Sequence, residues 1–230
     1  MFIVPLLAAI VGAVFAAAVL NQFRSRHRPY QAAWGAALAM FAAGAAFETF
    51  GIAAGWNAAS YKGYYLFGAI LNVGWLGVGT IYLLAPRRAG DVAALVMGLI
   101  SLAALAGVAV SPTNAALLQA QVPGRGAIGQ PAPIFPLLTN LPGSVILIGG
   151  AAWSAWQALR RNAPAGRVLG TALIAAGAFV VAGGHSYAQV RGLYVIQPAA
   201  EAIGIAVMFA GYLAVEVMGR LEVRPRAALR

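Results

Sequence analysis

The sequence predicts an all-α fold, an integral membrane bundle of seven transmembrane helices with the N-terminus outside and the C-terminus cytoplasmic. Three observations predict it. Of the 230 residues, 62% are hydrophobic and only 9% are charged, whereas soluble domains carry about 25% charged residues. Seven apolar runs reach the length of about 20 residues that a spanning helix needs. The arginines gather in the connections between these runs.

The helices are expected in chain order, separated by connections that are mostly short. They cover residues 2–23, 30–55, 63–85, 92–111, 134–158, 168–190 and 194–219. Apolar runs this long exclude the alternating strands of a membrane barrel. We expect the first run to be retained as a helix rather than cleaved as a signal peptide, because no Lys or Arg precedes it and three Arg follow it. Residues 1–230 are therefore expected to form a single transmembrane domain.

Positive charge in the connections predicts the orientation. Three basic residues fall on one side, namely Lys62, Arg125 and Arg191. Twelve fall on the other side, namely Arg24, Arg26, Arg28, Arg87, Arg88, Arg160, Arg161, Arg167, Arg220, Arg224, Arg226 and Arg230. Since cytoplasmic loops carry the excess of Lys and Arg, we expect a bacterial cytoplasmic (inner) membrane protein with a basic cytoplasmic tail at 220–230. This placement does not form the basic face of a nucleic-acid-binding protein, so we expect no such partner.

One connection is long. Residues 112–133 form an outer loop in which Ser111-Pro112 suggests an N-cap followed by a first-turn proline, opening a short surface helix over 114–121. Glycines and prolines make the rest of the loop irregular. The loop is either a lid over an outward-facing cavity or a surface connector without a role.

Ionisable residues inside a bilayer are costly, so each one is a candidate functional residue. Glu48, His185 and Glu201 fall at similar depth near the outer ends of their helices, and Asn72 and Asn140 fall within about two turns of that layer. An aromatic rim is expected above them, formed by Trp56, Tyr61, Tyr64, Tyr65 and Tyr187. We therefore predict a ligand-binding site composed of Glu48, Asn72, Asn140, His185, Glu201, Trp56, Tyr65 and Tyr187.

Four functions are compatible with this layer of polar residues. The leading prediction is a sensor-like or binding protein that takes a small hydrophobic or amphipathic ligand or a lipid. The second is a small-solute or proton-coupled carrier with a 3+1+3 helix plan, because Arg26, Pro29, Gly35 and Leu38 recur as Arg161, Pro164, Gly170 and Leu173. The third is a metal-dependent lipid hydrolase using Glu48, His185 and Glu201. The fourth is a structural subunit of a larger membrane complex with a partner membrane protein, in which these groups bond to one another or to kinked backbone and fix the helix packing.

The sequence argues against three kinds of cofactor site found in membrane helix bundles, namely retinal, haem and metal sites. The single lysine, Lys62, is expected in an outer loop, so a retinal Schiff base in the last helix is excluded. One intramembrane histidine cannot supply a bis-His haem site. The chain has no cysteine, and no local metal motif such as HExxH is present. We expect no cofactor, consider a metal improbable, and assign no catalytic residues.

Helices two and three carry a resemblance. The residues are Arg28-Pro29, Trp34, Glu48, Gly55-Trp56, Tyr64–Val73, Trp75–Thr80 and Leu83. This stretch, about a quarter of the chain, resembles uncharacterised multi-pass proteins of high-GC bacteria and, more distantly, seven-helix sensor modules that precede histidine kinases. The resemblance implies a small bacterial seven-helix protein and ligand sensing. Since no kinase follows the last helix, we expect any signal to pass to another protein.

Overall fold

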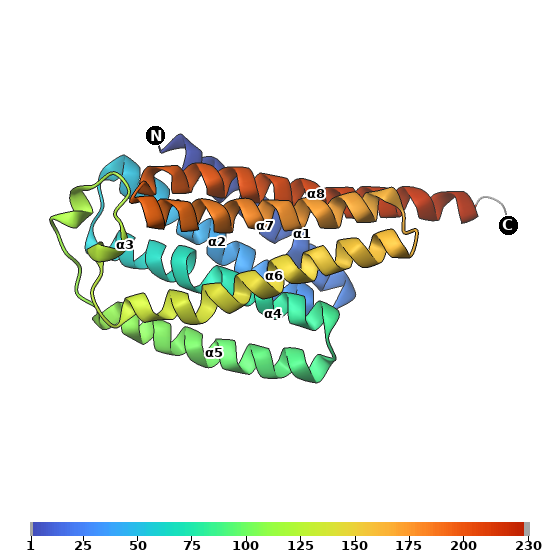
Figure 1. Ribbon diagram of the computed structural model, residues 1–230, viewed down its shortest axis with the longest axis horizontal. Coiled ribbons are helices and arrows are strands. Elements are labelled where there is room, and N and C mark those ends of the chain that lie inside the picture. Colours follow the sequence, from blue (N-terminus) through green and yellow to red (C-terminus); the bar gives the residue numbers. More distant parts are fainter. Residues whose placement is uncertain (1, 228–230) are drawn as a thin grey trace.

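A computed structural model confirms the all-α class and contains seven helices long and apolar enough to cross a membrane. The structure describes residues 2–227, and the side chains of residues 125 and 217–227 lie outside that description. The seven candidate spans lie side by side along the long axis of the molecule (Figure 1). The protein is therefore a polytopic membrane protein.

The helices follow one another with few residues between them. They are α1 Ile3–Arg26, α2 Pro29–Ala54, α3 Ala58–Tyr64, α4 Asn72–Leu84, α5 Arg87–Val110, α6 Phe135–Arg160, α7 Ala165–Arg191 and α8 Gln197–Ala227. A π-helical segment, η1 Tyr65–Leu71, joins α3 to α4, so these three elements form one span over Ala58–Leu84. Asn57 and Ser60 form a capping box that starts α3 before the predicted residue 63.

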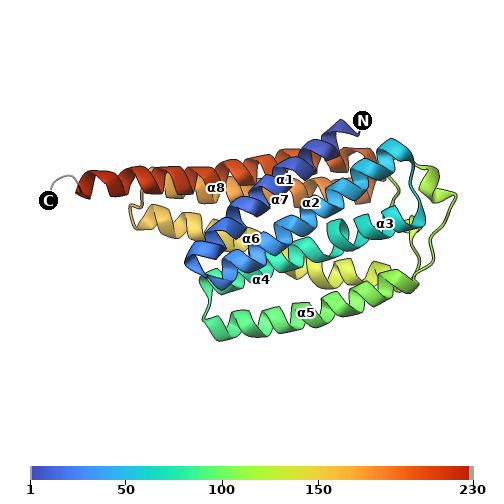
Figure 2. The ribbon, with the colours of Figure 1, turned by 180° about the vertical axis from the view of Figure 1, so that it is seen from behind.

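Six spans close into a ring. The packing runs from α1 to α2, to α4, to α6, to α7, to α8 and back to α1. Helix α5 lies outside the ring against α4 and η1 (Figures 1 and 2). Large side chains along α5, such as Leu95, Leu99 and Leu102, are each at least 60% exposed, as suits a surface that faces lipid.

Glycines set the closest approaches between spans. On α7 and α8, a Cβ atom on Gly177 would meet the carbonyl oxygen of Gly204 at 2.5 Å, and one on Gly170 would meet that of Gly211 at 2.6 Å. Lipid removes the hydrophobic drive for helix association, so close backbone packing has to supply it. The α7–α8 pair therefore depends on glycines that face one another.

The two ends of the bundle differ in chemistry. The end called here the arginine end carries the α1–α2, α4–α5 and α6–α7 turns and the C-terminal part of α8. The opposite end, the loop end, carries residues 111–131. The side chains of the tail expected at 220–230 lie outside the described residues, and the backbone of α8 continues to Ala227.

The expected start of a helix at Ser111 was wrong. Ser111 instead follows the last residue of α5. Its hydroxyl donates to the Gly107 carbonyl at 2.7 Å and accepts from the Ala132 amide at 3.0 Å. Within 114–121 only a single 3₁₀ turn forms, Leu117–Gln119. The hydroxyl thus closes the loop onto the end of α5, and the helix that the Ser-Pro pair suggested is not formed.

Replacing Gly177 with alanine should destabilise the bundle, whereas the same change at Gly183 in the same helix should not. The added Cβ at Gly177 meets backbone atoms of α8, while none lies within 4 Å of one at Gly183. Overpacking of this kind costs about 1–3 kcal/mol. Thermal unfolding of the two variants in detergent tests this, and equal melting temperatures would contradict the packing described here.

Candidate functional site

A cavity of about 780 Å³ occupies the loop half of the bundle. Its walls come from α2, the α3–η1–α4 span, α6, α7 and α8. Five predicted site residues line it, namely Tyr65, Asn72, Asn140, His185 and Glu201. The structure thus brings together side chains from four spans.

The polar floor of the cavity is built around one contact between α7 and α8. Nε2 of His185 lies 2.6 Å from Oε1 of Glu201. The Glu201 side chain is 6% exposed and that of His185 is 28% exposed. A His185 ring that carries a proton on Nε2 donates it to the Glu201 carboxylate in this contact.

Glu48 lies behind this pair, on α2. It is fully buried and interacts with Glu201 without lining the cavity. No donor of the described residues reaches either Glu48 carboxyl oxygen, nor the side-chain oxygen of Asn72 in the cavity wall. Two carboxyl groups can hydrogen-bond to each other only when one carries a proton. Three buried side-chain oxygens at or behind the floor thus have no donor among the described residues.

The π-helical segment η1 contributes Tyr65, Gly68 and Ala69 to the cavity wall. A π turn widens the helix and leaves backbone groups without their usual partners, which is why such segments recur at functional sites. Asn140 of α6 compensates here, since its Nδ2 donates to the Ala69 carbonyl at 2.7 Å. Its amide is thus committed to the backbone of η1 and ties α6 to the third span.

The loop of residues 112–133 packs into the bundle. The Tyr61 hydroxyl donates to the Gly124 carbonyl at 2.8 Å, and the Trp56 indole donates to the Gln121 carbonyl at 3.0 Å. Pro123 and Gly124 line the cavity. Of the two roles considered for this loop, the packing supports a cover over the cavity rather than a surface connector.

The cavity also reaches the side of the bundle. Three of its lining residues are strongly exposed: Leu137 at 63%, Leu141 at 69% and Val190 at 84%. They belong to α6 and α7, which approach each other at the arginine end and diverge toward the loop end (Figure 1). The surface between these two helices, called here the lateral mouth, is exposed and apolar, as suits a surface that faces lipid.

No protein-family model, curated protein or solved structure matches this chain. The resemblance of helices two and three therefore stays a prediction, and function has to be argued from the site itself. Among the described residues, no group of three or more His, Asp or Glu side chains is arranged to hold a metal ion. Glu48, His185 and Glu201 thus lie near one another but are not arranged as the ligands of a metal ion.

Besides Glu48, two predicted site residues do not line the cavity. Tyr187 is 53% exposed and does not line the cavity. Trp56 is buried behind the wall, edge-on to Tyr61 and Tyr64. The lateral mouth was not foreseen, because apolar residues that border a cavity have the same composition as those that face lipid.

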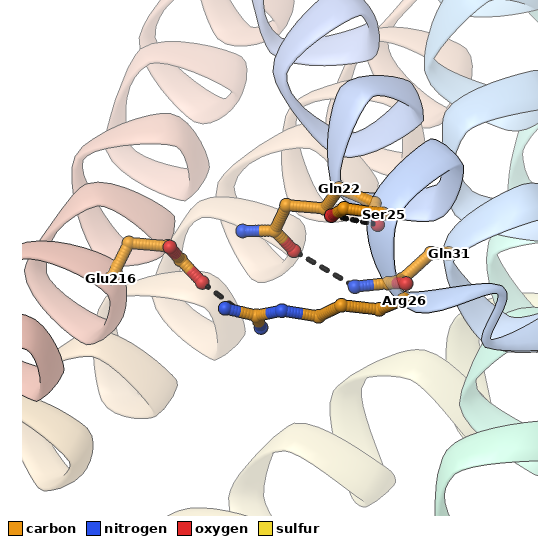
Figure 3. Close-up of polar contacts among 5 residues, drawn as sticks. All are labelled: Gln22, Ser25, Arg26, Gln31 and Glu216. Atoms are coloured by element: carbon orange, nitrogen blue, oxygen red, sulfur yellow. Dashed lines mark hydrogen bonds and ion pairs between the residues drawn. The ribbon is translucent and has the colours of Figure 1, made fainter.

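A second polar cluster joins α1, α2 and α8 near the arginine end (Figure 3). Nε2 of Gln31 donates to Oε1 of Gln22 at 2.9 Å, and Arg26 lies 3.4 Å from Glu216. Gln31 is fully buried, and sequence reasoning missed it because it falls near a helix start, where polar residues are common. The cluster fixes the α1–α2 turn against α8.

Replacing Tyr61 with phenylalanine should loosen the loop. The change removes one hydrogen bond to Gly124, worth about 1 kcal/mol, so the opened loop should become about fivefold more populated. Trypsin cleavage after Arg125, followed by mass spectrometry, measures this. Tyr187→Phe, which alters an exposed ring, is the matched control, and equal cleavage rates in the two variants would show that the bond does not hold the loop.

Proposed function

We propose that the protein binds an amphipathic small molecule whose polar head donates hydrogen bonds, and that this binding serves a sensor-like role. One observation carries the proposal. A single cavity connects a buried, acceptor-rich floor at Glu201 with lipid-facing side chains at the lateral mouth. A molecule with a donor at one end and an apolar chain at the other matches both ends.

The floor favours an ammonium or amine head. The Glu201 carboxyl group and the side-chain oxygen of Asn72 line the cavity and accept hydrogen bonds, and none of the described lining residues is Lys or Arg. An anionic head would face the Glu201 carboxyl group, with that of Glu48 behind it, in a region of low dielectric, which is unfavourable. Tyr61, Tyr64 and Tyr65 also line this cavity, and aromatic faces attract cations.

The rest of the cavity suits an apolar body. Its volume of about 780 Å³ lies within the range of about 300–1,000 Å³ usual for small-molecule sites. Leu147, Ile148 and Met208 also line it. Each methylene group that leaves water for such a surface contributes about 0.8 kcal/mol, so chain length should control affinity.

The ring of six spans favours a carrier as the second candidate. Helices α1, α2 and α4 form one half of the ring, α6, α7 and α8 form the other, and α5 lies outside. A 3+1+3 repeat predicts this arrangement. Arg26 and Arg161 also fall at corresponding ends of α1 and α6. Uptake of the same ligand into sealed vesicles would distinguish transport from binding alone.

Native mass spectrometry of the protein released gently from its membrane tests the binding proposal. We expect a discrete added mass on the wild type, and we expect added dodecylamine to displace it while dodecanoate does not. Glu201→Gln and His185→Gln should lose the added mass. Glu216→Gln makes the same chemical change near the arginine end and should keep it.

Two outcomes would contradict the proposal. The first is a bare protein mass that dodecylamine leaves unchanged. The second is equal dodecylamine binding by the wild type and by Glu201→Gln, provided that Glu201→Gln melts at the wild-type temperature. The second outcome would assign the His185–Glu201 contact to helix packing alone.

A further inference from the structure

A second pocket, of about 670 Å³, lies at the arginine end, far from the cavity described above. It lies between the α1–α2 turn and the α4–α5 turn, which are neighbours in Figure 2. Its lining residues are Arg26, His27, Arg28, Pro29, Tyr30, Tyr82, Leu83 and Arg87. None of them belongs to the cavity at the loop end.

The arginines of this pocket differ in whether they have an acidic partner. The Arg26 guanidinium is drawn toward Glu216 and away from α2 (Figure 3). Arg87 lies 4.0 Å from Asp91 in an exposed pair, a type of contact worth little. Within the part of the chain that the structure describes, Arg28 has no acidic partner within ion-pair distance. Two guanidinium groups are therefore available to an anion.

Two long helices also begin at this pocket. Helix α2 starts at Pro29 and α5 starts at Arg87, and no side chain caps either N-terminus. Neither helix has an acidic residue in its first turn. Amide groups in the first turn of a helix can donate to phosphate. Helices α1 and α4 end at the same pocket, so the dipoles of the four helices largely offset one another and the arginine side chains supply the positive charge. The pocket thus combines arginine side chains with backbone donors.

We propose that this pocket binds a phosphate group, supplied by the head of an anionic phospholipid. Arginine pairs with phosphate through two parallel hydrogen bonds, and Arg28 and Arg87 would approach it from opposite sides of the pocket. A lipid is favoured over free phosphate because the pocket borders apolar surface. Leu83, in its wall, is 44% exposed, and Val92 and Leu95 on α5 are 62% and 65% exposed. Acyl chains can lie along these side chains.

Titration of the purified protein with phosphatidylglycerol in a neutral detergent, followed by native mass spectrometry, tests the site. Arg28→Gln and Arg87→Gln should each weaken binding of the first lipid about tenfold, as expected for the loss of a charge-assisted contact. Arg88→Gln is the matched control, because it removes the same charge from the neighbouring position outside the pocket. It should bind like the wild type.

Three results would overturn the proposal. If Arg88→Gln weakens lipid binding as much as Arg87→Gln, only the general charge of this end attracts the lipid. If none of the variants changes binding, the pocket is not the site. If inorganic phosphate competes as effectively as the lipid, the ligand is free phosphate and the assignment to a phospholipid is wrong. Melting temperatures without lipid should match the wild type, since both side chains are exposed.

Discussion

The hydrocarbon core of a membrane contains no water that could satisfy a polar group, and each unsatisfied group there costs several kcal/mol. In this protein, polar side chains satisfy one another, or backbone carbonyl groups, across neighbouring spans and so connect these spans. Asn140 satisfies a carbonyl of η1, Trp34 donates to the Leu76 carbonyl at 3.0 Å, and His185 pairs with Glu201. Each contact joins helices that glycines already allow to approach closely. The cavity is the space that remains among these links.

Depth in the membrane could be predicted from the sequence, but the direction of side chains around each helix could not. Counting residues from the helix ends placed Glu201 and His185 at one level, because each residue advances a helix by a fixed 1.5 Å. Tyr187, predicted at the same level, is 53% exposed and does not line the cavity. Residues two positions apart lie on different faces of a helix, but their spacing does not say which of His185 and Tyr187 faces the cavity. In helices that are apolar on every side, no periodicity marks the face that points inward.

The conformation of the loop at residues 112–133 could not be predicted for a different reason. Ser-Pro is a sound local signal for a helix start, yet Ser111 closes the loop through a bond to Ala132. That bond depends on where α6 begins, which local sequence does not determine. Likewise, nothing near Tyr61 in the sequence indicates that its hydroxyl meets Gly124. Contacts across tens of residues are set by packing of the whole bundle, and a single sequence carries little information about them.

The lateral mouth between α6 and α7 determines which concentration governs occupancy of the cavity. An amphiphile that enters from the side is drawn from the pool dissolved in the bilayer, where it is enriched by about 0.8 kcal/mol for every methylene group. Its apparent dissociation constant, expressed per volume of water, must then change with the amount of lipid in the sample. Expressed as a mole fraction of the lipid, the constant would be independent of that amount. Occupancy in a cell would accordingly report the composition of the membrane itself.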